Sequence, residues 1–214
     1  MPLLTPQILL RAYTMGLFPM ADSRRSSKLH WIDPEERGVL PLDRFHVPRS
    51  LRKTLRRGHF EIRINTAFDA VIAGCAEAKE GRPDTWINPQ IITLFGQLHH
   101  MGLAHSVESW EDGRLVGGLY GLALGAAFFG ESMFSRRTDA SKVALVDLVA
   151  RLKLGGAKLL DTQFITDHLA RFGAVEIPRS RYMEYLDTAL RQQARFLTEP
   201  VDWQAALSDG PNLA

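Results

Sequence analysis

Glu131 stands at the end of an apolar run, where the sequence turns basic. In "FFGESMFSRR" (residues 128–137) it is flanked by glycine, phenylalanine and methionine and followed by two arginines. On a regular strand, Phe129, Glu131 and Met133 share one face. A carboxylate in such surroundings is costly to bury unless it is paired. It either forms an ion pair with a basic residue of the 136–142 segment, or lies at an apolar pocket and holds an ammonium group.

A second acidic position follows two leucines in "LLDTQF" (residues 159–164). On an extended strand, Asp161 and Gln163 share one face, and Leu160 and Thr162 share the other. An acid and an amide side by side can bind a cation or orient a nucleophilic amine. The alternative is a strand-end turn in which Asp161 caps the short helix that follows.

Positive charge gathers in "PRSLRKTLRR" (residues 48–57), which contains no acidic residue. Its cations fall at helical spacing and are Arg49, Arg52, Lys53, Arg56 and Arg57. Such a helix face is either solvated or follows the phosphates of a nucleic acid. Tyr13, Trp31 and Trp86 would stack on unpaired bases if they are exposed, and would belong to the core if they are buried.

The composition excludes several classes of protein. The 214 residues are 45% hydrophobic, carry a net charge of +2 and include one cysteine, Cys75, which excludes an internal disulfide and a cysteine-rich zinc site. A chain of this length can bury a sizeable core. The histidines show no metal-ligand spacing, and we find no glycine-rich phosphate loop. We therefore expect a cytoplasmic protein with no metal, no cofactor, no signal peptide and no membrane span.

Apolar periodicity and turn residues divide the chain into short elements. The expected helices cover residues 5–15, 48–57, 67–79, 89–102, 140–154, 166–173 and 181–196. The expected strands cover residues 59–68, 158–164 and 174–180, with two or three antiparallel strands in 104–134 that turn at "EDGR". Thr138 or Asp139 is expected to cap the helix over 140–154. Prolines predict a loop over 16–43, and the tail after Thr198 is weakly patterned. This irregular order indicates an α+β fold rather than a doubly wound sheet.

Several strings are together characteristic of one family. They are "GLFPM", "TWI", "HSVE", "LVGGLYG", "FGESMFSR", "ASKVAL", "LLDTQF" and "GAVEIPR", with Trp31, Pro34 and Arg37 spaced as W..P..R. Over residues 5–190 the chain resembles the leucyl/phenylalanyl-tRNA–protein transferases. The resemblance implies a GNAT-like (acyl-CoA N-acyltransferase-like) mixed-sheet catalytic domain at residues 37–214, beside a small N-terminal domain at residues 1–36.

The resemblance implies a reaction that needs no cofactor. Members of the family move leucine or phenylalanine from aminoacyl-tRNA to the N-terminal arginine or lysine of an acceptor protein, which marks it for N-end-rule degradation. The chemistry is aminolysis of an ester by an α-amine whose pKa is about 7.7–8.0, so positioning can supply most of the rate. An apolar pocket separates side chains differing by one methylene by only about 1–3 kcal/mol, so leakage to methionine is expected. We expect a monomer with no membrane partner.

The resemblance also implies roles for residues at the reaction centre. The aminoacyl side chain would lie in a pocket formed by Phe128, Met133, Leu160 and Leu119. Glu131 would hold the aminoacyl ammonium. Asp161 and Gln163 would engage the N-terminus of the acceptor, with Asp161 favouring its basic side chain or helping its amine to lose a proton.

The implied tRNA surface combines aromatic and basic residues. Trp86 would stack on the terminal adenosine, with Tyr13 or Trp31 supplying a further ring. The basic helix would contribute Arg52, Lys53, Arg56 and Arg57. Two positions depart from the family pattern, because Met20 stands where tryptophan is frequent and Thr166 where asparagine is familiar.

Two other functions remain open on the residues alone. A GNAT-type N-acetyltransferase would use acyl-CoA, but "RRTDASK" stands where a glycine-rich pyrophosphate loop would open a helix. A non-enzymatic RNA-binding module would need only the basic helix and the tryptophans. Substitution of Asp161 separates these readings, because a pure binding module should not depend on it.

Overall fold

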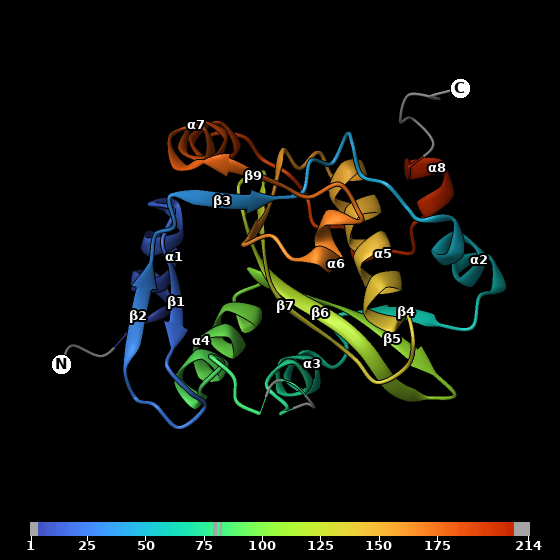
Figure 1. The fold of residues 1–214 in the computed structure, drawn as a ribbon, viewed down its shortest axis with the longest axis horizontal. Helices are drawn as coiled ribbons and strands as arrows, with labels where there is room; N and C mark the ends of the chain where they lie inside the picture. The colour runs from blue at the N-terminus through green and yellow to red at the C-terminus, as the bar shows by residue number, and fades with distance from the viewer. Residues whose placement is uncertain (1–3, 79–80, 82, 208–214) are drawn as a thin grey trace.

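The computed structural model describes residues 4–78, 81 and 83–207, which form a seven-stranded mixed sheet with helices on both faces and a small two-stranded sheet (Figure 1). The large sheet has the strand order β4-β5-β6-β7-β8-β3-β9. The strand bounds are β3 Glu36–Val39, β4 Glu61–Ile64, β5 Ala104–Glu111, β6 Arg114–Leu124, β7 Ala127–Ser135, β8 Leu159–Gln163 and β9 Val175–Pro178. β7 and β8 are parallel, and the other neighbouring pairs are antiparallel. This mixed sheet confirms the expected α+β class.

Two hydrophobic cores lie on the two faces of the sheet. One core joins the sheet to α3 (Phe68–Cys75), α4 (Pro89–His100), α1 (Pro6–Thr14) and α7 (Arg179–Leu190). The other core joins it to α5 (Ala140–Leu154), α2 (Arg49–Arg57), α6 (Asp167–Ala170) and α8 (Trp203–Leu207). Successive side chains of a strand point into opposite cores, so Leu119 of β6 belongs to the core on the α5 side and Tyr120 to the core on the α3 side.

The N-terminal segment packs directly on the large sheet. α1 begins after Thr5, whose hydroxyl accepts a hydrogen bond from the Ile8 amide. Leu9 and Tyr13 of α1 are fully buried in the core that α3 and α4 share. β1 (Phe18–Ala21) and β2 (Leu29–Ile32) then form the two-stranded antiparallel sheet. The division of the chain into domains at residues 36 and 37 stays a prediction.

The predicted loop over residues 16–43 is wrong, because β1, β2 and β3 all lie within it. Pro19 belongs to β1 and lies opposite Trp31 of β2. A two-stranded sheet leaves each strand with a free edge, where proline can be accommodated. The weakly patterned tail also contains an unexpected element, the short helix α8.

Several helix ends differ from the expected positions. α3 stops at Cys75; the expected end at Lys79 lies outside the described residues. Neither Thr138 nor Asp139 caps α5 through its side chain, and the Ser141 amide instead donates to Ser135 Oγ at 3.0 Å. α6 is shorter than expected, and α7 both starts and ends before the helix expected over 181–196.

The central hairpins follow the sequence-based expectation. β5, β6 and β7 are three antiparallel strands, and the "EDGR" segment turns through Asp112 and Gly113, both with positive φ. Among the described residues, no helix has the length and hydropathy needed to cross a bilayer.

Candidate active site

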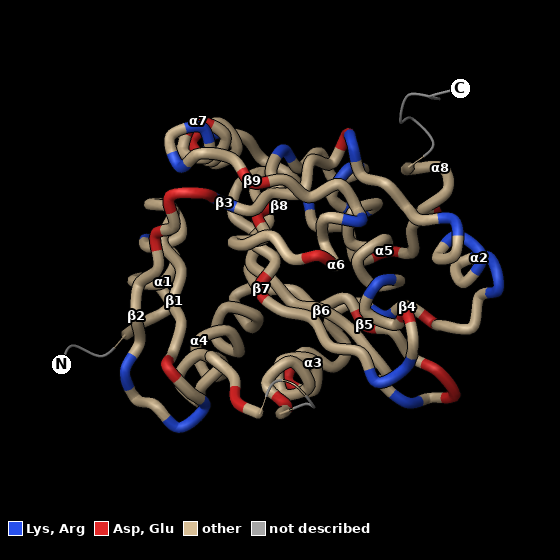
Figure 2. The backbone as a smooth tube through the Cα atoms, in the orientation of Figure 1, with Lys and Arg blue, Asp and Glu red and all other residues tan. Residues whose placement is uncertain are grey.

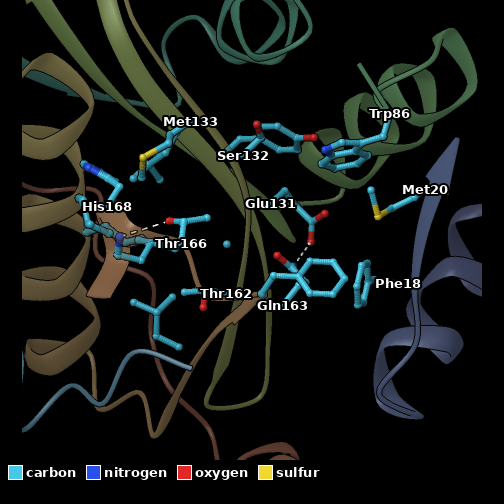
Figure 3. A pocket seen from close by; sticks show the side chains of 18 residues that line it. Phe18, Met20, Trp86, Glu131, Ser132, Met133, Thr162, Gln163, Thr166 and His168 are labelled. Atoms are coloured by element: carbon cyan, nitrogen blue, oxygen red, sulfur yellow. Dashed lines mark hydrogen bonds between the residues drawn. The ribbon is translucent and has the colours of Figure 1, made fainter. Parts of the chain in front are cut away.

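A cavity of about 300 Å³ lies where two parallel strands separate. β7 and β8 pair only between residues 127–129 and 159–161, and the residues beyond this pairing line the cavity. Trp86, Met20 and Phe18 form one end, and Met133, Thr166 and His168 lie at the other (Figure 3). Helix α5 and strand β8 add the apolar residues Leu145, Leu148 and Leu160. Glu131 and Gln163 lie between the two ends (Figure 3).

A register shift in the sheet brings Glu131 into this cavity. β6 pairs Tyr120 with Ser132 and then Gly121 with Gly130, so Glu131 is the extra residue of a β-bulge. The bulge also reverses the alternation of β7, which places Phe128 and Met133 in the same core although they are five residues apart. Regular alternation would have separated them. The sequence contains no direct signal for the bulge.

The buried carboxylate of Glu131 is held by neutral hydrogen-bond donors. Its Oε1 accepts from the hydroxyl of Tyr13 at 2.7 Å and from Nε2 of Gln163 at 3.2 Å. Burial raises the pKa of Glu131 to about 8; the Asp161 charge adds to the shift, while the Tyr13 hydrogen bond and the Arg37 charge oppose it. The hypothesis of a rim ion pair is wrong, because the nearby cations pair elsewhere: Arg136 with Glu77, Arg137 with Glu111, and Lys142 with Asp139.

Asp161 lies behind the cavity rather than on its surface. It is fully buried, does not line the cavity, and forms a two-pronged ion pair with Arg37 through N···O distances of 3.0 and 2.7 Å. The hydroxyl of Tyr182 donates to the same carboxylate at 2.7 Å, and so does the backbone N–H of Gln163 at 2.8 Å. The expected direct contact between Asp161 and an acceptor therefore does not fit this placement. Asp161 does not cap α6 either, since the hydroxyl of Thr166 accepts from the Leu169 amide there.

Gln163 adopts a strained backbone conformation that directs its amide at Glu131. Its φ is +58°, and the Phe164 amide donates across it to the Thr162 carbonyl at 2.7 Å. This three-residue turn is rare and costs about 1–3 kcal/mol for a residue other than glycine. Strain of this kind persists only where surrounding contacts enforce it, and it occurs frequently at functional sites.

The four residues expected to form the aminoacyl pocket separate into two groups. Met133, Leu160 and Leu119 line the cavity, whereas Phe128 is buried behind it and stacks on Phe196 with ring centroids 5.6 Å apart. The prediction therefore does not hold for Phe128 as a lining residue. It also missed much of the apolar and aromatic lining, including Phe18, Tyr120, Leu145, Leu148, Phe164 and Leu169. Of these, Leu145 was recognisable only as part of the buried face of its helix.

The residues expected to bind tRNA do not form one surface. Trp86 lines the cavity, but Trp31 does not, although it is 40% exposed. Tyr13 is fully buried with its hydroxyl on Glu131, so its ring is unavailable for stacking, which corrects that expectation. The basic helix α2 lies at the far end of the molecule from β1 and β2 (Figures 1 and 2). Its side chains line a separate groove and include Arg49, Arg52, Lys53, Arg56 and Arg57.

Comparison with known proteins agrees with the motifs. A family model described as "Leucyl/phenylalanyl-tRNA protein transferase" matches residues 39–187, and a model of the N-terminal domain of that family matches residues 3–35. A leucyl/phenylalanyl-tRNA–protein transferase of Paramagnetospirillum magneticum is 63% identical over 205 residues, covering 95% of this chain and 98% of the relative. Proteins of the same name are 58% identical in Maricaulis maris, over 90% of this chain and 89% of the relative, and 56% identical in Rhizorhabdus wittichii, over 89% and 77%. The expected GNAT-like fold is that of the matched family. The chain belongs to the leucyl/phenylalanyl-tRNA–protein transferase family.

Proposed function

We propose that this chain transfers leucine or phenylalanine from aminoacyl-tRNA to an acceptor protein within the cavity between β7 and β8. The observation that carries the proposal is the position of Glu131. A buried carboxylate lies between an end with an indole ring and an end with methionine and leucine side chains (Figure 3). An aminoacylated adenosine has the same order of groups: a base, an ammonium-bearing ester and a side chain.

The donor would occupy the length of the cavity. Trp86 stacks on the terminal adenine, and Met20 supplies an apolar contact in place of a second tryptophan ring. Met133, Leu160 and Leu119 contact the leucyl or phenylalanyl side chain, and Phe128 supports this wall from behind. Glu131 then accepts hydrogen bonds from the α-ammonium group and holds the ester carbon in place.

Gln163 would bind the α-amine of the acceptor beside the ester. Its amide group is fixed by Glu131 on one side and by its turn on the other. We assign to Asp161 a positioning role, because its carboxylate is committed to Arg37, Tyr182 and the Gln163 backbone. The acceptor class that we propose is a protein with N-terminal arginine or lysine, modified for the N-end-rule pathway.

The body of the tRNA would contact the basic groove of α2. This groove is lined by the cations of α2 together with His46 and Val47, and it shares no lining residue with the cavity. A tRNA is long enough to contact both with its 3′ end in the cavity. We also propose that the enzyme works as a monomer.

Transfer of labelled leucine from charged tRNA to two peptides tests the proposal. One peptide begins with arginine and the other with alanine, and the rest of their sequences is identical. We expect product with the arginine peptide and little or none with the alanine peptide. Folded protein that transfers leucine to neither peptide, with charged tRNA that a known transferase accepts, would contradict the proposal.

Membership of the family removes the support for the acetyltransferase and RNA-module alternatives. An acetyltransferase would bind acyl-CoA tightly. A non-enzymatic RNA-binding module would bind RNA independently of the cavity. Isothermal titration with acetyl-CoA, beside transfer measurements on Gln163→Ala, separates all three readings. We expect no binding of acetyl-CoA and a loss of transfer in the variant.

A further inference from the structure

Tyr120 brings an unpartnered hydroxyl group to the cavity. It is fully buried and lines the cavity, and its hydroxyl has no hydrogen-bond partner in the part of the chain that the structure describes. A buried polar group without a partner costs about 1–3 kcal/mol. Such groups are uncommon in folded proteins, and each one calls for an explanation. The phenol oxygen therefore has free hydrogen-bonding capacity in a residue that lines the cavity.

The ring of Tyr120 is held in a fixed orientation. It makes edge-to-face contacts with Phe68 and Phe95, with centroid distances of 5.9 and 5.3 Å. Its backbone lies opposite Ser132, directly beside the bulge that carries Glu131. Burial and then the charge of Glu131 raise the pKa of Tyr120 well above its usual value, so the group stays a neutral hydroxyl. The strand pairing thus places the backbone of Tyr120 beside the bulge residue Glu131, and both residues line the cavity.

One carboxylate oxygen atom of Glu131 accepts no hydrogen bond from the described residues and can bond a ligand. Oε1 accepts from Tyr13 and Gln163, while no group among the described residues bonds to Oε2. An ammonium group has three N–H donors, and a single carboxylate oxygen cannot satisfy all of them. A phenol oxygen has lone pairs that can accept a second N–H.

Two other cavity atoms also have no partner among the described residues, Thr162 Oγ1 and His168 Nε2. His168 lies beside Met133 and Thr166, at the opposite end of the cavity from Trp86 (Figure 3). Thr162 belongs to β8, across the cavity from the β6–β7 pair. Of Tyr120, Thr162 and His168, strand pairing places Tyr120 beside the bulge of Glu131.

We propose that Tyr120 is a specificity residue that recognises, together with Glu131, the free α-ammonium group of the aminoacyl ester. The proposal rests on the proposed function and adds a second acceptor to the ammonium site. It implies that the enzyme recognises the α-amino group of the aminoacyl donor as well as its side chain. Donors whose α-amine is acylated or absent are disfavoured because Glu131 and Tyr120 then lose the N–H donors that satisfy them.

Tyr120→Phe tests this role with a pair of non-hydrolysable donor analogues. One is adenosine with a 3′-amide-linked phenylalanyl group, and the other carries a 3-phenylpropionyl group that lacks only the α-amine. We expect the variant to bind the phenylalanyl analogue about tenfold more weakly, which is about 1.4 kcal/mol. Binding of the deamino analogue should change less than about twofold, because that ligand has no N–H to lose. Tyr185→Phe, at an exposed tyrosine, is the matched control and should change neither affinity.

Two results would overturn the proposal. If both analogues bound equally more weakly, the Tyr120 hydroxyl would bond the ribose or the carbonyl group rather than the ammonium. If both bound as tightly as to the wild type, the hydroxyl would have no part in donor recognition. The variant keeps the aromatic ring, so its unfolding temperature should equal or exceed that of the wild type. Wild-type protein that fails to transfer leucine would refute the proposed function itself, whereas active wild type with an unchanged analogue ratio in Tyr120→Phe refutes only this inference.

Discussion

Gly38 of β3 lies opposite Gln163 of β8, and the space beside it admits no side chain. A Cβ on Gly38 would stand 2.5 Å from the carbonyl carbon of Phe164, 2.7 Å from its oxygen and 2.8 Å from the Ile165 amide. All three are backbone atoms, which cannot rotate away. The turn that aims Gln163 at Glu131 therefore depends on a missing side chain on the neighbouring strand.

Gly38→Ala should displace the Gln163 turn and lower kcat. A displacement of about 1 Å near reacting groups can cost on the order of 100-fold in rate, and we expect a loss of at least tenfold. Binding of the donor analogue should change less than kcat, because the added Cβ meets the backbone of Phe164 and Ile165 and not Trp86 or Met133 at the two ends of the cavity. Gly96→Ala is the control, since its Cβ would meet only Asp69 Oδ1, at 4.0 Å. Full activity in Gly38→Ala would disprove the positioning role of the turn.

Asp161→Asn and Gln163→Ala should fail in different ways. Asparagine leaves the buried charge of Arg37 uncompensated, and breaking a buried ion pair costs about 3–5 kcal/mol. Gln163→Ala removes the side-chain amide but leaves no buried charge unpaired. We therefore expect it to lose transfer with a smaller decrease in the free energy of unfolding. Urea unfolding of both variants, beside transfer rates, checks this. If Asp161→Asn kept wild-type stability and lost only activity, Asp161 would act on the acceptor directly rather than through the fold.

The sequence predicted the elements that carry the site better than it predicted their geometry. The motifs around Glu131 and Gln163 and the α5 helix were recognisable from residue type and spacing. The bulge at Glu131 was not, because an inserted residue is defined only by the partner strand. The pairing of Arg37 with Asp161 joins residues 124 positions apart, and no periodicity connects them. The hydrogen bond from Tyr13 to Glu131 was not predictable for the same reason, because the two residues lie 118 positions apart.

Glu131→Gln should stabilise the protein at alkaline pH while reducing transfer. The folded pKa of Glu131 is about 8, above the ordinary value, so the folded state holds a proton that the unfolded state releases between about pH 4.5 and 8. The contribution of this group to stability therefore falls across that window as the pH rises. Thermal unfolding should show little difference between wild type and variant at pH 4.5 and a higher unfolding temperature for the variant at pH 9. An equal difference at both pH values would contradict the raised pKa.

Met133→Ala should shift donor preference towards phenylalanine. The substitution enlarges the apolar end of the cavity, which a phenyl ring can fill better than an isobutyl group. Selectivity from such contacts is about 1–3 kcal/mol, so we expect a change of about tenfold in the ratio of kcat/KM values. Competition between leucyl- and phenylalanyl-tRNA measures this ratio directly. Met101→Ala, at a methionine that is 49% exposed, should leave the ratio unchanged. A ratio that moves towards leucine would place the side chain elsewhere.

Charge reversal on α2 should weaken tRNA binding in a salt-dependent way. Lys53 and Arg56 are exposed and line the basic groove, whereas Arg52 also donates to the Val47 carbonyl and is best left in place. Each lost phosphate contact reduces the magnitude of the negative slope of log K against log salt concentration by about one. The double variant Lys53→Glu, Arg56→Glu should therefore show a slope reduced by about two in a titration from 50 to 200 mM salt. Lys158→Glu, Arg191→Glu, at two exposed cations outside the groove, is the control for net charge. Equal slopes in wild type and double variant would show that the cations of α2 face solvent and make no contact with tRNA.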